Sequence, residues 1–377
     1  MSAFGEQVLP PWRRAVLKVG SSLLADDGGL HPGNATHLAA FVAAMHAAGR
    51  EVVLVSSGAV AAGRAIAGQA VAPGAAMAER QALAALGQAR LIGFWQQLSA
   101  RPVAQVLLSH DDLRNRRRYL NARATLRELL ARGALPVVNE NDTVAVDELK
   151  LGDNDNLAAI VAALVDAEVL LLATDVDGLY DADPRRHPEA RPVEVVAQMN
   201  AALLATAGGA GSGVGTGGMR TKLEAAQRAA QAGIGTVLFN GTRSDVVDGL
   251  ARDRLLGTRI HASRTRVAAR KHWLHNAPAE PGVILVDDGA ARALVEKGAS
   301  LLPGGVLDAR GEFRRGDMVL LAQRGAEGGE EPVARGVTQY SAADIRRVAR
   351  RHSRDIQATL GYNYGGNIVH RDDLVLV

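Results

Sequence analysis

Residues 15 to 22 read Ala15-Val-Leu-Lys-Val-Gly-Ser-Ser22, an apolar run that ends in a glycine and two serines. The apolar run predicts a buried strand, and the small residues after it predict a turn. Glycine lets a backbone approach a ligand closely, and neighbouring N–H and hydroxyl groups can donate to phosphate. The plain alternative is a solvated lysine beside a turn. Because a lysine inside an apolar strand is costly to bury without a partner for its charge, Lys18 indicates a functional site.

The same succession of an apolar run and a polar segment recurs up to about residue 240. We expect four more strands, at Glu51 to Val55, Leu135 to Val138, Val169 to Ala173 and Thr236 to Phe239. Three of them lead into polar segments, namely Ser56-Ser-Gly58, Asn139-Glu-Asn-Asp142 and Thr174-Asp175. Since Ala- and Leu-rich helical patterns separate the strands, we predict an α/β protein with a mostly parallel sheet sandwiched by helices. Ligands of such sheets bind beyond the carboxyl ends of the strands, where these polar segments lie.

The composition is that of an ordinary globular protein. The 377 residues are 47% hydrophobic and 22% charged, which excludes a disordered or collagen-like chain. The net charge of +3 is too small to indicate a nucleic-acid-binding protein. The chain has no cysteine, which excludes a disulfide scaffold and thiolate metal sites. The most apolar segment, Leu157 to Thr174, contains two acidic residues and is too short to span a bilayer, so we expect a cytoplasmic protein without membrane contact.

The pattern changes after about residue 245. Arg252 to His275 is rich in basic residues and is a candidate hinge, and from Pro278 the expected strands are short and separated by glycine-rich turns. This is typical of a compact β-rich domain of about a hundred residues. We therefore divide the chain into a catalytic domain (residues 1–260), a linker (261–280) and a small β-rich domain (281–377).

Two dense clusters of asparagine and aspartate form the strongest polar motif. They are Asn139-Glu-Asn-Asp142, which follows an apolar segment, and Gly152-Asp-Asn-Asp-Asn156, which precedes one. Asparagine-rich turns are the common explanation for such clusters. An EF-hand fits poorly, because the regular alternation of acidic ligands is absent. Amides and carboxylates together suit a substrate that carries both an ammonium group and carboxylate groups.

A glycine-rich segment, Gly208 to Gly218, leads to Lys222 and then to a clear helical pattern. A glycine loop, a lysine and a helix N-terminus together can bind phosphate. The spacing is not that of a Walker A loop. A GxGxxG match begins at Gly213, but a helical stretch precedes it instead of a strand, which excludes a dinucleotide fingerprint. Only five of the 43 basic residues are lysines, so the lysines in these motifs stand out.

Taken together, these motifs resemble the amino-acid kinase family, in the branch whose members phosphorylate the γ-carboxylate of L-glutamate. The motifs in family order are Lys18-Val-Gly-Ser-Ser, Val55-Ser-Ser-Gly-Ala-Val, Val138-Asn-Glu-Asn-Asp, Gly152-Asp-Asn-Asp-Asn, Thr174-Asp-Val-Asp-Gly-Leu-Tyr180 and Gly215-Thr-Gly-Gly-Met-Arg-Thr-Lys222. The resemblance covers residues 15 to 260, and the tail from Pro281 is similar to a PUA domain. It implies the amino-acid kinase fold and ATP-dependent formation of L-glutamyl 5-phosphate, the first step of proline biosynthesis.

The resemblance also implies a role for each motif residue. Lys18 and Lys222 would be catalytic and contact the phosphates, and Asp155 would orient both lysines. The residues expected to hold glutamate are Ser57, Asp142 and Asn154, with Asn139 nearby. The residues expected to bind the nucleotide, besides Lys18, are Thr174, Asp175, Thr216, Gly217, Gly218, Met219, Arg220, Thr221 and Lys222. Mg²⁺ is expected on the ATP, held mostly by phosphate oxygens and water, with no metal ligand from the protein.

The resemblance further implies a homo-oligomer that proline inhibits. RNA binding by the PUA-like tail is not expected, because residues 278–377 contain 13 basic and 14 acidic residues. Two alternatives remain open at this point. A related kinase acting on N-acetylglutamate, aspartate or carbamate is disfavoured by the two asparagine-rich clusters and the PUA-like tail. An RNA-binding module with an inactive kinase fold is disfavoured by the intact Lys18, Asp155 and Lys222.

Overall fold

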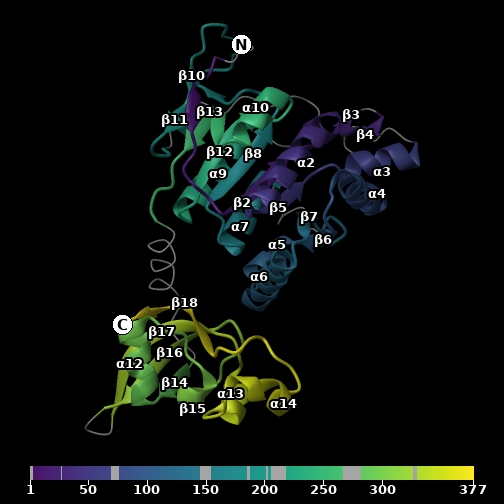
Figure 1. Cartoon of the computed structure of the whole chain (residues 1–377). Coiled ribbons are helices and arrows are strands. Elements are labelled where there is room, and N and C mark those ends of the chain that lie inside the picture. The colour runs from purple at the N-terminus through teal and green to yellow at the C-terminus, as the bar shows by residue number, and fades with distance from the viewer. Residues whose placement is uncertain are drawn as a thin grey trace. The chain divides into compact units, whose positions relative to one another are not determined.

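The computed structural model describes residues 3–26, 28–68, 76–144, 154–184, 187–200, 203–204, 218–265, 282–325 and 329–377. The chain forms two compact units, Met1–Arg266 and Val267–Val377 (Figure 1). Most of the linker expected at residues 261–280 lies outside the described residues.

The first unit is built on a nine-stranded sheet with the order β1-β13-β12-β8-β2-β5-β7-β6, in which β11 also pairs with β13. The strands from β12 to β6 run parallel to their neighbours: β12 (Gly235–Asn240), β8 (Val169–Thr174), β2 (Arg14–Val19), β5 (Glu51–Ser56), β7 (Leu135–Glu140) and β6 (Val103–Leu108). The edge beyond β12 is mixed and consists of β13 (Arg254–Ile260), β1 (Glu6–Val8) and β11 (Val195–Val196). The prediction of a mostly parallel sheet is confirmed.

Helices cover both faces of this sheet (Figure 1). One face packs against α2 (Pro32–Ala47), α10 (Ser244–Leu250) and α4 (Met77–Leu98), and the other against α6 (Arg116–Ala131), α7 (Asn154–Leu164) and α9 (Met219–Gln231). The shorter helices of this unit are α1 (Ser21–Leu24), α3 (Ala59–Ala67) and α5 (His110–Arg114). Two small sheets have two strands each: β3 (Ala25–Asp26) pairs with β4 (Gly29–Leu30), and β9 (Leu179–Tyr180) pairs with β10 (Pro192–Val193). Local sequence signals favour the start of two of these helices. Pro32 occupies the first turn of α2, and Ser109 caps α5 through a capping box with Asp112.

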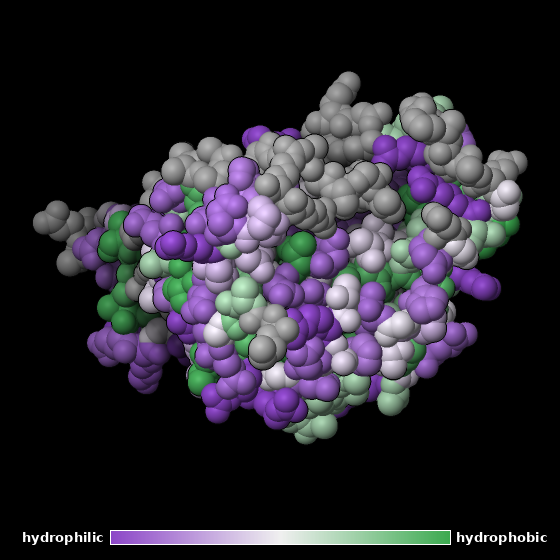
Figure 2. Space-filling model, turned by 90° about the horizontal axis from the view of Figure 1, so that it is seen from above, coloured by the Kyte–Doolittle hydropathy of each residue, from purple (hydrophilic) through white to green (hydrophobic). Residues whose placement is uncertain are grey.

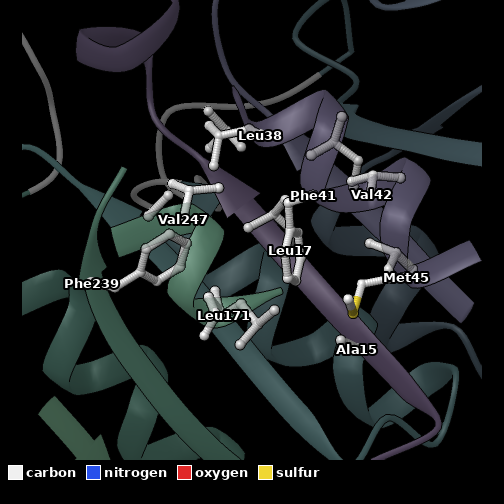
Figure 3. Close-up of a cluster of buried hydrophobic side chains, with 14 of the residues drawn as sticks. Ala15, Leu17, Leu38, Phe41, Val42, Met45, Leu171, Phe239 and Val247 are labelled. Atoms are coloured by element: carbon white, nitrogen blue, oxygen red, sulfur yellow. The ribbon is translucent and has the colours of Figure 1, made fainter. Parts of the chain in front are cut away.

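The strand side chains alternate between the two faces. Figure 3 shows the first face, where side chains of the central strands meet those of α2 and α10; the labelled residues are Ala15, Leu17, Leu38, Phe41, Val42, Met45, Leu171, Phe239 and Val247. Val16 packs in the second cluster, with α7 and α9. Because successive strand residues point to opposite faces, the position of Lys18 after Leu17 directs it towards the face that α7 and α9 cover.

The second unit has a five-stranded sheet with the order β15-β14-β16-β17-β18 and its own hydrophobic core. Its elements are β14 (Gly282–Val286), β15 (Val306–Gly311), β16 (Met318–Arg324), β17 (Glu330–Thr338), β18 (Val369–Leu376), α12 (Asp288–Lys297), α13 (Ala342–Val348) and α14 (Ile356–Leu360), with short 3₁₀ turns at Pro303–Gly305 and Ser353–Asp355. Only the β14–β16 pair is parallel among the pairs of this sheet in the described residues. A separate β-rich domain at the end of the chain is therefore confirmed.

One face of the molecule is mixed in character. Figure 2 shows a face on which hydrophilic residues alternate with small groups of hydrophobic ones. In the part of the chain that the structure describes, no helix is both long enough and apolar enough to cross a membrane.

Candidate active site

The candidate site lies beyond the carboxyl ends of the parallel strands. Strand β2 pairs with β5 on one side and with β8, which comes much later in the sequence, on the other side. The order of the strands therefore reverses direction at β2. In α/β proteins, ligands bind at the carboxyl ends of the strands where the strand order changes direction in this way. Gly20, Ser57 and Asp175 directly follow β2, β5 and β8, and Asn139 is the second-last residue of β7.

The centre of the site is one carboxylate that contacts two lysines. Asp155, the second residue of α7, places Oδ1 2.6 Å from Lys18 Nζ and Oδ2 3.2 Å from Lys222 Nζ. The Thr221 hydroxyl donates to the same Oδ2 at 3.0 Å. The three charged residues are buried, with exposed fractions of 0% for Asp155, 5% for Lys18 and 8% for Lys222. The structure therefore brings together residues from β2, α7 and α9 that are far apart in the sequence.

Two opposing effects set the charge of Asp155. Burial raises the pKa of its carboxyl group, but the positive charges of Lys18 and Lys222 outweigh burial and hold that pKa below its usual value. The carboxylate is ionised at neutral pH, so two cations and one anion leave the cluster with one net positive charge. Because buried ion pairs add little to stability, this arrangement points to a function in binding or catalysis.

Gly20 leaves room for the Lys18 ammonium group. A Cβ atom at residue 20 would lie 3.3 Å from Lys18 Nζ, closer than most such contacts. Gly20 also precedes α1 and has no side chain to cap it. The positive charge of Lys18 beside a helix start favours an anion at this place.

A second cluster lies next to the charged one, because Asn154 directly precedes Asp155. The Asn154 side-chain amide donates to Ser57 Oγ at 2.8 Å and to Asn139 Oδ1 at 2.9 Å. Asn139 is buried, and its Oδ1 also accepts from the backbone N–H of Glu140 at 2.9 Å. Asp142 lies in the turn that follows β7 and is partly exposed. The structure thus joins three of the four expected glutamate-binding residues in one hydrogen-bonded group.

The residues expected to bind nucleotide are distributed differently. Thr174 is buried at the end of β8, and its hydroxyl donates to Asp175 Oδ1 at 3.3 Å. The residues Gly218, Met219, Arg220, Thr221 and Lys222 form the cap and first turn of α9. Arg220 pairs with Glu224 at 2.9 Å on the exposed side of that helix. Thr216 and Gly217 lie outside the described residues.

Sequence reasoning missed a polar group at the end of β12, beside Thr174. The Asn240 amide donates to Asp177 Oδ1 at 2.8 Å, and Asn240 Oδ1 accepts from the Thr242 backbone and hydroxyl at 3.0 and 2.6 Å. Arg243 lies 3.6 Å from Asp177 Oδ2. The signal that could have found this group is its place at the carboxyl end of a parallel strand, one residue beyond the expected strand.

The chemistry of the site suits phosphate better than a directly bound metal. Within the described residues, no group of three or more His, Cys, Asp or Glu side chains could hold a metal ion. The carboxylate closest to the centre, Asp155, already contacts two ammonium groups. Two lysines beside the start of α9 have the charge that suits a polyphosphate chain or another multiply charged anion.

Comparisons with known proteins agree with this fold. The model of the amino acid kinase family matches residues 13–240, and that of the PUA domain matches residues 282–360. The glutamate 5-kinase of Xanthomonas campestris pv. campestris (strain 8004) is 70% identical over 363 residues, which are 96% of this chain and 100% of that protein. The glutamate 5-kinase of Xylella fastidiosa (strain M23) is 67% identical over 377 residues, 100% of this chain and 98% of that protein.

Among solved structures, a UMP kinase from Bacillus anthracis is 16% identical, with a TM-score of 0.48 over 68% of this chain and 98% of that chain. The family model spans more than half of the chain, and both relatives align along nearly their full length. With its parallel sheet and the lysine pair at the strand ends, the chain belongs to the amino acid kinase family.

Proposed function

We propose that this chain transfers the γ-phosphoryl group of ATP to the γ-carboxylate of L-glutamate, giving ADP and L-glutamyl 5-phosphate at the start of proline biosynthesis. The observation that carries the proposal is the buried group of Lys18, Asp155 and Lys222 beside the amides of Asn139 and Asn154. The relatives named glutamate 5-kinase support the choice of substrate.

The reaction brings two anions together, a carboxylate and a triphosphate. The site must therefore supply positive charge where negative charge concentrates in the transition state. Lys18 and Lys222 would do so from opposite sides of Asp155, whose carboxylate holds both ammonium groups in place. Because the carboxylate oxygen of glutamate attacks phosphorus directly, positioning and electrostatic stabilisation carry the reaction without a covalent enzyme intermediate.

The polar cluster beside the lysines would bind glutamate. We propose that Ser57, Asn139 and Asn154 hydrogen bond to its carboxylates and that Asp142 provides the counter-charge for its ammonium group. The contacts of Asn154 with Ser57 and Asn139 support this role, since they hold three hydrogen-bonding groups together before any substrate arrives.

We propose that Thr174, Asp175 and the segment from Thr216 to Lys222 bind the nucleotide. The proximity of Thr221 and Lys222 to Asp155 supports a phosphate position at the start of α9. Mg²⁺ would accompany ATP and would be held mostly by phosphate oxygens and water, as is usual for this ion. When bound, the ion neutralises charge on the phosphates.

We further propose a cytoplasmic homo-oligomer that proline inhibits, with a catalytic domain at residues 1–260, a linker at 261–280 and a PUA-like domain at 281–377. We propose a structural or regulatory role for the PUA-like domain instead of RNA binding. The balance of 13 basic and 14 acidic residues in 278–377 supports this choice. Salt-dependent RNA binding by the full chain would overturn it.

Glutamate-dependent release of ADP tests the proposed function. The assay compares L-glutamate with N-acetyl-L-glutamate, L-aspartate and carbamate, each with and without proline. Hydroxylamine added to the reaction should trap an acyl phosphate as the γ-hydroxamate. Activity with glutamate alone supports the proposal, whereas turnover of another acceptor without turnover of glutamate would replace it.

A further inference from the structure

Ser57, the residue expected to hold glutamate directly after β5, takes part in three hydrogen bonds. Its backbone N–H donates to the carbonyl of Val19 at the end of β2, at 3.0 Å. Its backbone carbonyl accepts from the Ser56 hydroxyl at 3.0 Å, and its own hydroxyl oxygen accepts from Asn154 at 2.8 Å. One of these three contacts, the one to the Ser57 carbonyl, depends on the orientation of the Ser56 hydroxyl.

The Ser56 hydroxyl is oriented by a residue that belongs to none of the family motifs. The indole N–H of Trp95, near the end of α4, donates to Ser56 Oγ at 2.9 Å. Ser56 and Trp95 are almost fully buried, at 0% and 1% exposed. Since water does not reach this bond, Ser56 Oγ accepts from the indole and can direct its own hydrogen to the Ser57 carbonyl.

The same face of α4 contacts the next residues of the turn. A Cβ atom at Gly58, whose φ is +112°, would lie 3.6 Å from Leu91 Cδ1. A Cβ atom at Gly87 would lie 1.8 Å from the Ala59 carbonyl oxygen, so the backbones of α3 and α4 touch there. Gly87, Leu91 and Trp95 follow each other at helical spacing, so that α4 supports the turn of residues 56–59 along its length.

The Trp95 ring is enclosed almost completely by the core, and a cavity of about 180 Å³, lined also by Ala39, Ala43 and Arg101, borders it. Within this packing, the hydrogen bond to Ser56 fixes the direction of the indole N–H.

We propose that Trp95 is a positioning residue for glutamate: through Ser56 it sets the place of Ser57 in the substrate site. The proposal rests on the proposed function. It predicts a larger effect on the binding of glutamate than on that of the nucleotide, because the ammonium groups of Lys18 and Lys222 are held by Asp155, which takes no part in this bond.

The test is a double-mutant cycle with Trp95→Phe and Ser56→Ala. Each single variant should raise the KM for glutamate about fivefold, as the loss of one buried hydrogen bond predicts, with little change in the KM for ATP. The double variant should be no worse than the poorer single variant, because both changes remove the same bond. Trp12→Phe is the matched control: it is the same substitution at another buried tryptophan of this unit, whose indole N–H has no hydrogen-bond partner among the described residues.

The outcomes separate this inference from the proposed function. A wild-type enzyme without glutamate-dependent turnover would remove the proposed function itself. If the wild type is active and Trp95→Phe leaves the KM for glutamate unchanged, the inference is wrong. The inference is equally wrong if Trp95→Phe changes the KM for glutamate, the KM for ATP and kcat together and also lowers the midpoint of thermal unfolding. Such a pattern indicates a general loss of structure. Additive effects of the two substitutions would also overturn it.

Discussion

Replacing Asp155 with asparagine should nearly abolish turnover, because it removes the charge that holds both lysines. Asparagine has almost the same shape, so the change isolates the charge. Hydrogen bonds to charged groups contribute about 1.5–3 kcal/mol each, and Asp155 contacts Lys18 at 2.6 Å and Lys222 at 3.2 Å. The asparagine oxygen can still accept from one lysine, but its amide NH2 can only donate and would face the other ammonium group. With the charge gone, the loss approaches that of both charge-assisted contacts, about 3–6 kcal/mol, which corresponds to a decrease in kcat of about a hundredfold to more than ten-thousandfold.

Initial rates of ADP release at saturating ATP and glutamate measure this effect, and circular dichroism at the assay temperature confirms that the variant is folded. The matched control is Asp166→Asn, a carboxylate that also contacts two cations, Arg123 at 3.2 Å and Arg127. Asp166 lies in the turn after α7, whereas Asp155 lies at the start of that helix. The Asp166→Asn control should therefore keep the wild-type kcat. A folded Asp155→Asn enzyme with wild-type turnover would refute the role of the carboxylate, as would an equal loss in the control.

Three further predictions concern catalysis, helix packing and pH. Lys222→Ala should lower kcat at least about a hundredfold with less effect on the KM for glutamate, in the same assay; an effect on KM alone would contradict it. Gly87→Ala should lower the free energy of unfolding by about 1–3 kcal/mol in urea titrations, because the new Cβ would lie 1.8 Å from the Ala59 carbonyl oxygen. Gly93→Ala in the same helix meets nothing within 4 Å and should raise stability by about 0.4–1 kcal/mol; equal effects at both positions would disprove the close approach. Burial and a nearby arginine lower the pKa of His46 from 6.5, so the unfolded chain binds the proton first and stability falls as the pH drops from 6.5 towards the folded pKa. Urea titrations of His46→Gln across this pH range should show a smaller loss than the wild type, and parallel curves would contradict the assignment.

Part of this architecture could be predicted from the sequence because local patterns determine it. Each expected strand of the parallel sheet is present and is extended by one or two residues, since apolar runs identify the buried centre of a strand better than its ends. Lys18 was recognisable from local sequence because a charge within an apolar strand needs a partner. Local sequence does not identify its partner, because Asp155 lies on the distant helix α7; only the family resemblance predicts its role.

The contacts that could not be predicted join distant residues without a sequence pattern. Trp95 and Ser56 are separated by 39 positions, and nothing in the composition of α4 distinguishes this tryptophan from an ordinary core residue. Asn240 lies just past the expected strand, and its contact with Asp177 spans 63 positions. Such pairs depend on how helices cross the sheet, which local propensity does not determine.

The location of Lys18 on a central strand has a consequence for how this chain tolerates change. β2 is paired along its whole length with β5 and along most of it with β8, so it cannot slide by one residue without breaking both ladders. Such a slip would move the Lys18 side chain to the other face of the sheet, where its ammonium group would lie in the apolar layer beneath α2. Insertions near the sheet borders at β6 and β1 face no such double constraint. Variation can therefore accumulate at the rim of the sheet while the reacting charge keeps its place.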